Sequence, residues 1–265
     1  TAGYCAGMFF YNDANGNKIE GDFINNTAQS CGGGMFFYYT TDKNNFSGSF
    51  INNSALGMLD PTVGNGGAIT FKNVSTNSIF NSDFINNTAS LNGGAVNYRE
   101  TPKNIIFNAN FINNTAQRGG GVNFFNTFED VIFNEEFIGN SAENGGALAA
   151  GYGTIEDISF KNNHANNGGA VYLAGSGSTV NCNFTNNRAT HNGGAVYISE
   201  KGNVVNCSFA DNSAAHNGGA VYSKFGTVEN SNFTANTASN DGGAVSLSYP
   251  SNVANCHFAD NSAKN

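Results

Sequence analysis

The sequence predicts an all-β protein, a single-stranded parallel β-helix in which one short repeat is stacked on itself about ten times. Three observations support this prediction. A Phe recurs at intervals of 23 to 34 residues, an Asn stands three places after each of these Phe residues, and a Gly-Gly pair stands two places before an apolar residue in nearly every repeat. A propeller blade would need about 40 residues, so these intervals favour a solenoid.

The composition agrees with short strands and turns. Only 11% of residues are charged, whereas the chain contains 34 Gly and 23 Phe. Gly accepts the backbone conformations of tight turns, and regularly spaced Phe can fill a packed interior. The formal charge is −8 with 11 scattered Lys and Arg residues, which disfavours nucleic acid as a partner. No apolar stretch is long enough to span a bilayer, so we expect no membrane insertion by this segment.

The Phe and Asn positions define two rows of the predicted helix. The Phe row is Phe23, Phe50, Phe84, Phe111, Phe137, Phe160, Phe184, Phe209, Phe233 and Phe258, and the Asn row is Asn26, Asn53, Asn87, Asn114, Asn140, Asn163, Asn187, Asn212, Asn236 and Asn261. Stacking the turns at a spacing of roughly 4.8 Å places each residue over its equivalent. We therefore expect stacked Phe rings and buried Asn amides that hydrogen-bond from turn to turn.

Each turn is predicted to contain three short strands. One follows Gly-Gly and carries two inward apolar residues, such as Val171 and Leu173. A second leads into the Phe, with inward residues two and four places before it, and a third carries the Asn and Ala positions. Glu156 and Glu229 interrupt the second strand's apolar row, so we expect a register adjustment in those two turns. Residues 1–265 are predicted to form one continuous β-helix with an inserted turn at 56–65.

The two motifs recur as Gly66-Gly67-Ala68-Ile69 and Phe84-Ile85-Asn86-Asn87 throughout the chain. They resemble the repeats of chlamydial polymorphic outer membrane proteins, and Phe-Ile-Asn-Asn-Thr-Ala is similar to adhesin-like surface proteins of methanogenic archaea. The resemblance implies a right-handed parallel β-helix, a cell-surface or secreted location, and adhesion to host cells, microbial cells or glycan surfaces. It implies nothing about the ligand, because these motifs are scaffold residues. The chain begins and ends inside a repeat, so we expect the export signal and anchor to lie in flanking sequence.

Candidate binding residues lie between the motifs. Side chains that follow the first apolar residue after Gly-Gly should point away from the core, where aromatic rows can contact sugars or proteins or simply stabilise the sheet. The inserted turn is a second candidate, because loops on rigid scaffolds often carry function. These candidates are Tyr172, Tyr197, Tyr222, Phe9 and Phe36 in the aromatic rows, and Leu56, Met58 and Leu59 in the inserted turn.

The main alternative is a polysaccharide lyase or hydrolase, because many β-helices are carbohydrate enzymes. Its candidate carboxylates are Glu129-Asp130, Glu156-Asp157 and Glu135-Glu136, but we interpret them as solvated surface charge and predict no catalytic residue. His191 and His216 recur one repeat apart without an evident third ligand, so no metal site and no cofactor is predicted. Cys5 and Cys31 are the best candidates for a disulfide. A structural fibre or sheath subunit, with end-to-end or lateral self-association, is the third alternative.

Overall fold

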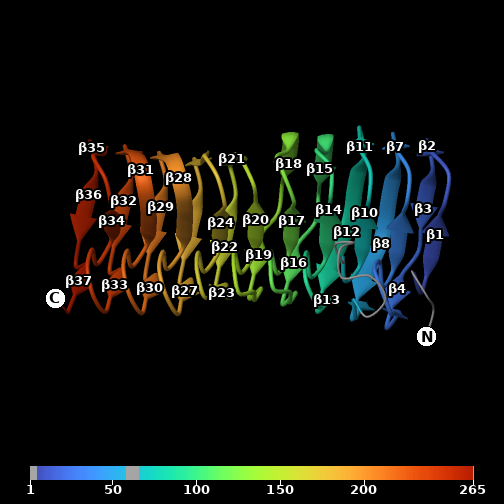
Figure 1. The fold of residues 1–265 in the computed structure, drawn as a ribbon, viewed down its shortest axis with the longest axis horizontal. Helices are drawn as coiled ribbons and strands as arrows, with labels where there is room; N and C mark the ends of the chain where they lie inside the picture. Colours follow the sequence, from blue (N-terminus) through green and yellow to red (C-terminus); the bar gives the residue numbers. More distant parts are fainter. Residues whose placement is uncertain (1–4, 58–65, 265) are drawn as a thin grey trace. The chain divides into compact units, whose positions relative to one another are not determined.

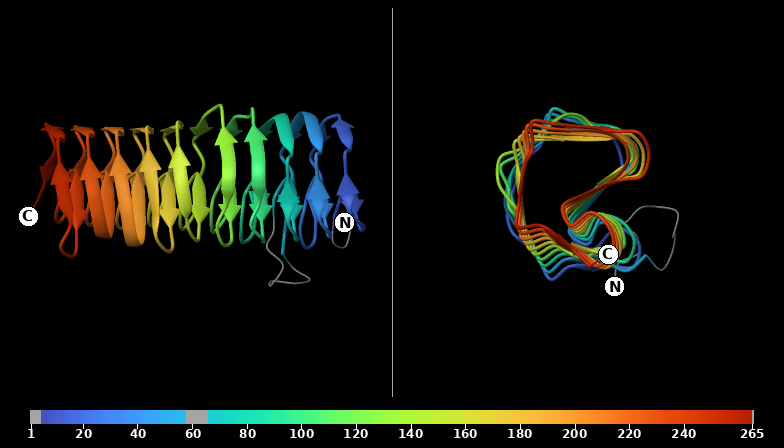
Figure 2. Two further views of the ribbon diagram at one scale, coloured as in Figure 1. Left: turned by 90° about the horizontal axis from the view of Figure 1, so that it is seen from above. Right: turned by 90° about the vertical axis from the view of Figure 1, so that its left-hand side faces the viewer.

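The computed structural model describes residues 5–57 and 66–264, and every regular element within them is a β-strand. The chain divides into two compact units, Thr1–Glu136 and Phe137–Asn265. Within each unit the chain coils so that strands of successive turns lie side by side and run parallel (Figure 1). Viewed along the stack, the turns of a unit follow nearly the same outline (Figure 2). The predicted parallel β-helix of about ten turns is confirmed, while its continuity from one unit to the next stays a prediction.

The first unit contains three sheets. The strands after Gly-Gly are β1 (Met8–Phe10), β6 (Met35–Phe37), β10 (Ile69–Phe71), β14 (Val96–Tyr98) and β17 (Val122–Phe124). The Phe sheet contains β2 (Ala14–Asn15), β3 (Lys18–Glu20), β4 (Phe23–Ile24), β7 (Thr41–Asp42), β8 (Asn45–Ile51), β11 (Ser75–Thr76), β12 (Ile79–Ile85), β15 (Lys103–Phe107), β16 (Phe111–Ile112) and β18 (Glu129–Phe133). The third sheet is formed by β5 (Thr27–Ala28), β9 (Ser54–Ala55) and β13 (Thr88–Ala89). The short strands β2, β7 and β11 add a further strand to their turns.

The second unit also contains three sheets. The sheet after Gly-Gly contains β20 (Leu148–Ala150), β21 (Gly153–Glu156), β24 (Val171–Leu173), β25 (Gly177–Val180), β28 (Val196–Val205), β31 (Val221–Glu229), β34 (Val245–Leu247) and β35 (Asn252–Ala254). The Phe sheet contains β19 (Phe137–Ile138), β22 (Ser159–Lys161), β26 (Asn183–Thr185), β29 (Ser208–Ala210), β32 (Asn232–Thr234) and β36 (His257–Ala259). The third sheet contains β23 (His164–Ala165), β27 (Arg188–Ala189), β30 (Ser213–Ala214), β33 (Thr237–Ala238) and β37 (Ser262–Ala263).

The Phe row forms a ladder of stacked rings in each unit. Phe50 lies 5.0 Å, centroid to centroid, from both Phe23 and Phe84, and the same arrangement continues through Phe111. In the second unit the equivalent distances lie between 4.7 and 5.2 Å. Parallel in-register pairing brings like rings over one another, and most of them are fully buried. The predicted aromatic row is therefore confirmed in both units.

The Asn row forms a ladder of buried amides. Asn53 Nδ2 donates to the carbonyl of Phe23 at 2.7 Å and to Asn87 Oδ1 at 3.0 Å, and the Asn53 N–H donates to the same oxygen at 2.9 Å. Each such amide donates to a backbone carbonyl of the preceding turn and to the Asn side chain of the next turn, which offsets the cost of burying it. The Asn residues lie in the bend before the third strand rather than within that strand.

The register change predicted for two turns extends over more of the second unit. The inward row there is Ile155, Thr179, Val204 and Val228, each five places before its Phe, and all four are buried. Val180 and Val205, which the sequence pattern places inward, are only partly buried. The cause is a residue with positive φ three places before the Phe, such as Asn181 at 54°, because a single left-handed residue reverses the alternation of the strand.

Candidate functional site

The three predicted tyrosines form a continuous stack on β24, β28 and β31. The rings of Tyr172 and Tyr197 lie 5.2 Å apart, and those of Tyr197 and Tyr222 lie 5.1 Å apart, with interplanar angles of 9° and 13°. Each ring is half-buried, because the Gly-Gly turns pack on this face of the strands: a Cβ built on Gly145 would lie 3.1 Å from the Cβ of Tyr172. Burial, reinforced by the neighbouring tyrosines, raises the pKa of Tyr197. Only part of each ring is available to a ligand.

The prediction that Phe36 faces solvent is wrong. Phe9 is 45% exposed, but Phe36 is 1% exposed, although the two rings stack at 5.4 Å. The Gly-Gly turn covers Phe36, since a Cβ built on Gly32 would lie 2.9 Å from the Phe36 Cβ. Phe36 packs against Cys31 and Cys5, which are both thiols in the structure. Burial raises the pKa of the Cys5 thiol to about 11.

The inserted turn is described only at its beginning. Leu56 is 39% exposed, and its backbone N–H donates to the carbonyl of Ala28 at 3.0 Å. Met58 and Leu59 lie outside the described residues. The proposal that this turn binds a partner therefore depends on Leu56 alone among the residues whose positions are described.

A groove that the sequence motifs did not indicate lies in the second unit, at the corner between the Gly-Gly strands and the strands that follow them. Its volume is about 840 Å³, within the usual range for ligand sites. Its lining is Tyr152, Ser176, Glu200, Lys201, Phe225, Gly226, Thr227, Pro250, Ser251 and Asn252. Aromatic faces, hydroxyl groups, amides and two charges therefore meet in one surface depression.

The parallel register explains how residues from distant repeats meet in this groove. Gly153, Gly177, Gly202 and Gly226 pair in register along the stack, and Ser251 continues the row because Asn252 pairs with Thr227. The residue before each of these positions therefore forms its own row, one side chain per turn. That row is Tyr152, Ser176, Lys201, Phe225 and Pro250, and all five line the groove. We call it the corner row.

The two aromatic residues of the groove are each held by one contact, Tyr152 by a glycine and Phe225 by another aromatic ring. Tyr152 is 57% exposed, and its ring lies against Gly175, where an added Cβ would come within 2.3 Å of a ring carbon. Phe225 stacks on Tyr249 at 4.6 Å and 19°, and Tyr249 is 51% exposed. The ring of Tyr152 therefore has a fixed backing and an open face, which is the arrangement of a binding platform.

The charges of the groove are unevenly paired. Glu200 forms an ion pair with Lys224 at 3.6 Å, while Lys201 makes no ion pair within the described residues and is exposed. Lys201 also lines a neighbouring hollow of about 310 Å³ with Ser176 and Asn203. Asn203 accepts a hydrogen bond from Thr227 Oγ1 at 2.8 Å. Glu200 and Lys201 are the charged residues of the lining, and Lys224 offsets Glu200, so one positive charge remains beside the neutral polar groups.

One sequence signal marks the groove. The corner row carries Tyr, Ser, Lys and Phe in successive repeats, whereas the motif positions are nearly constant within the chain. The constant positions mark the scaffold and do not reveal this variable row. The row becomes visible only when the strands of the second unit are aligned in their observed register, which differs from the predicted one.

Two of the carboxylates considered for catalysis, Glu129 and Asp157, are engaged in local contacts. Glu129 pairs with Lys103 at 3.1 Å across β15 and β18, and Asp157 accepts from Asn181 Nδ2 at 3.0 Å. Glu129 and Asp157 belong to different compact units. The rings of His191 and His216 lie 5.1 Å apart. Within residues 5–57 and 66–264, no group of three His, Cys, Asp or Glu side chains is placed to hold a metal ion.

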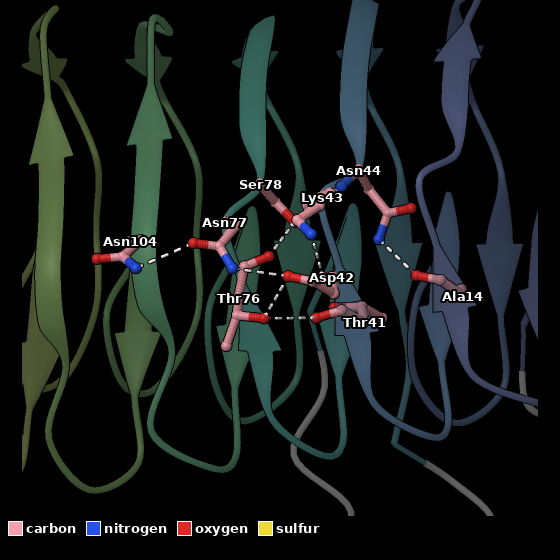
Figure 3. A network of polar contacts seen from close by, with 9 residues as sticks. All are labelled: Ala14, Thr41, Asp42, Lys43, Asn44, Thr76, Asn77, Ser78 and Asn104. Carbon is pink, nitrogen blue, oxygen red and sulfur yellow. Dashed lines mark hydrogen bonds and ion pairs between the residues drawn. The ribbon is translucent and has the colours of Figure 1, made fainter.

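A surface network in the first unit shows how such carboxylates are used. Asp42 Oδ1 accepts from Thr76 Oγ1 at 2.8 Å and from Asn77 Nδ2 at 2.7 Å, and Asn77 in turn accepts from Asn104 (Figure 3). These hydrogen bonds lower the pKa of Asp42. The network ties successive turns together on the outside of the unit.

Comparison with known proteins identifies the repeat. Residues 157–174, 181–199 and 206–224 each match the Chlamydia polymorphic membrane protein repeat. Each matched segment begins three places before a Phe of the second unit and runs through the Asn and Gly-Gly positions into the strand that follows them, so the chain carries repeats of this type. No protein of curated function and no solved structure matches the chain. Among the described residues, none belongs to a helix of the length and apolar character that crossing a membrane requires.

Proposed function

We propose that this chain is the β-solenoid part of a protein displayed outside the cell, and that it attaches the cell to host cells, other microbial cells or glycan-covered surfaces without chemical turnover. The match to a polymorphic membrane protein repeat supports the surface location. The solenoid supports the attachment role, because it presents side chains at regular intervals along a rigid stack.

The observation that carries the proposal is that the constant residues of the repeat are buried, whereas the variable residues are exposed. Motif residues such as Phe184 and Asn187 are buried in ladders that hold successive turns together. The exposed positions between them vary, and in the second unit they create the groove beside Tyr152 and Phe225. A scaffold whose constant residues are internal and whose variable residues are external is suited to recognition.

Cell attachment provides the test. Beads coated with the 265-residue chain are presented to cultured epithelial cells and to bacterial cells, and retained beads are counted after shear. We expect retention of the coated beads and its reduction by Tyr152→Ala and by Tyr197→Ala. Phe125→Ala is the matched control, because Phe125 is 60% exposed and lies in the first unit. Retention no greater than that of uncoated beads would disprove the proposal.

Two further measurements distinguish an attachment protein from an enzyme and from a structural fibre or sheath subunit. Release of unsaturated or reducing sugar from a panel of polysaccharides would establish an enzyme. Concentration-dependent growth of assemblies in light scattering, together with absence of bead retention, would establish a fibre or sheath subunit. We expect neither result.

A further inference from the structure

We infer that the corner row of the second unit binds a linear glycan that carries carboxylates, with the sugar chain lying along the stack from Tyr152 to Phe225. This inference rests on the proposed function, because it names the class of surface molecule to which the solenoid attaches. It depends on the direction of the groove, on the chemistry of its lining and on the charge of Lys201.

The direction of the groove favours a polymer. The corner row has one side chain per turn, so Tyr152 and Phe225 are separated by three strand spacings, about 14 Å. A sugar unit in an extended glycan advances by a distance similar to one strand spacing. Successive sugars can therefore meet successive members of the row, Tyr152, Ser176, Lys201 and Phe225.

The lining fits sugar rings better than a peptide strand. The open face of Tyr152 and the ring of Phe225 offer apolar surfaces for the C–H faces of pyranoses, and Ser176, Thr227 and Asn252 offer hydroxyl and amide groups. A peptide that binds by adding a strand needs an unpaired sheet edge. The strands here are paired to the turns before and after them: β28 pairs with β25 and with β31.

The charge of the groove favours an acidic glycan. Lys224 is paired with Glu200 at 3.6 Å, so Lys201 is the cation that remains for a ligand. Lys201 lies midway along the corner row, between Ser176 and Phe225, and also lines the adjoining hollow. A sugar carboxylate placed over Lys201 would gain a charge-assisted contact that a neutral sugar cannot make.

Oligogalacturonates test the inference, because methyl esterification removes their charge and keeps the chain. Binding of the dimer, tetramer and hexamer to the 265-residue chain is measured by calorimetry, with free acids and methyl esters compared. We expect affinity to rise from dimer to hexamer, as more turns are contacted. Tyr152→Ala should weaken acid and ester by about tenfold, and Lys201→Gln should weaken the acid alone by about fivefold.

Lys43→Gln is the matched control, since Lys43 is an exposed lysine of the first unit, and it should leave binding unchanged. Absence of binding to every oligomer, an equal loss in Lys43→Gln, or full binding by both groove variants would overturn the inference. Circular dichroism of each variant verifies that the fold is kept. Bead attachment without oligomer binding would refute this site and leave the proposed function standing, whereas oligomer binding without attachment would refute the proposed function and retain the site.

Discussion

The two units form the same repeat, but they differ in where the chain turns at a residue with positive φ, which we call the left-handed corner. In the first unit a residue with positive φ stands seven places before the Phe, as Asn77 does before Phe84, with φ of 49°. The long strand β12 then runs without a break into the Phe. In the second unit the left-handed residue stands three places before the Phe, as Asn206 does before Phe209, with φ of 53°. Moving this one conformation changes which side chains point inward.

The interior of each unit follows from this difference. The inward row of the first unit is aromatic, with Phe80 lying 4.3 Å from Phe46 and 4.6 Å from Phe107. The corresponding row of the second unit is aliphatic or small, as at Thr179 and Val204. Repeats are 26 to 34 residues long in the first unit and 23 to 25 in the second. The longer coil encloses the larger rings at the close packing of protein interiors, and the shorter coil closes around smaller side chains.

The asparagine ladder is present in both units, and its loss should be the most damaging change in either. Asn87→Ala and Asn187→Ala each remove an amide that donates to a Phe carbonyl and to the next Asn, at 2.8 to 3.0 Å. Several buried groups lose their partners, and we expect each variant to lower the free energy of unfolding by about 4 kcal/mol. Urea unfolding, followed by circular dichroism, measures the effect.

An exposed amide provides the control for the ladder. Asn108 donates to Asn81 at 2.7 Å on the surface, and Asn108→Ala should change the free energy of unfolding by less than about 0.5 kcal/mol. Equal losses in the buried and exposed variants would mean that burial of the amide is not what makes the ladder important.

The aromatic interior of the first unit should not accept the side chains of the second. Phe80 is fully buried between two stacked rings, and Phe80→Val leaves a cavity that the neighbouring rings cannot close. We expect a loss of about 3 kcal/mol in the free energy of unfolding, measured in urea. Ile106→Val, at a partly exposed position of β15, should cost less than about 1 kcal/mol. A loss at Phe80 no larger than that at Ile106 would contradict the account of two different interiors.

The position of the left-handed corner can be tested with a matched pair of asparagines. Asn206 and Asn108 both stand three places before a Phe, both are exposed, and both donate to an equivalent Asn at 2.7 Å. Only Asn206 has positive φ. Asn206→Val should therefore lower the free energy of unfolding by about 1.5 kcal/mol, because a β-branched residue resists this conformation. Asn108→Val should change the free energy of unfolding by less than about 0.5 kcal/mol. Thermal unfolding measures both variants, and an equal loss of stability in the two would contradict the proposed difference between the units.

This pair also shows what the sequence could and could not predict. The ladders were predictable because Phe, Asn and Gly-Gly recur at constant offsets, and stacked turns place equal offsets together. The register of the second unit was not, because an Asn three places before the Phe is compatible with both an extended and a left-handed backbone. The corner row was hidden for the same reason. Phe36 was misplaced because spacing shows which face of a strand a residue occupies, but not that the Gly-Gly turn folds over that face.

The smallest predicted effect concerns Ala235, which occupies a left-handed position of the second unit. Two places after the Phe, the repeats carry residues such as Asn186 and Asp211, with φ of 55° and 57°, whereas Ala235 adopts φ of 55° there. Asn tolerates this conformation better than Ala, and an Asn side chain at this position can donate to the neighbouring Asp211. Ala235→Asn should therefore raise the free energy of unfolding by about 1 kcal/mol. Ala210→Asn, in the extended strand β29, should give no gain, and a gain at both positions would attribute the stabilisation to the added side chain rather than to the backbone.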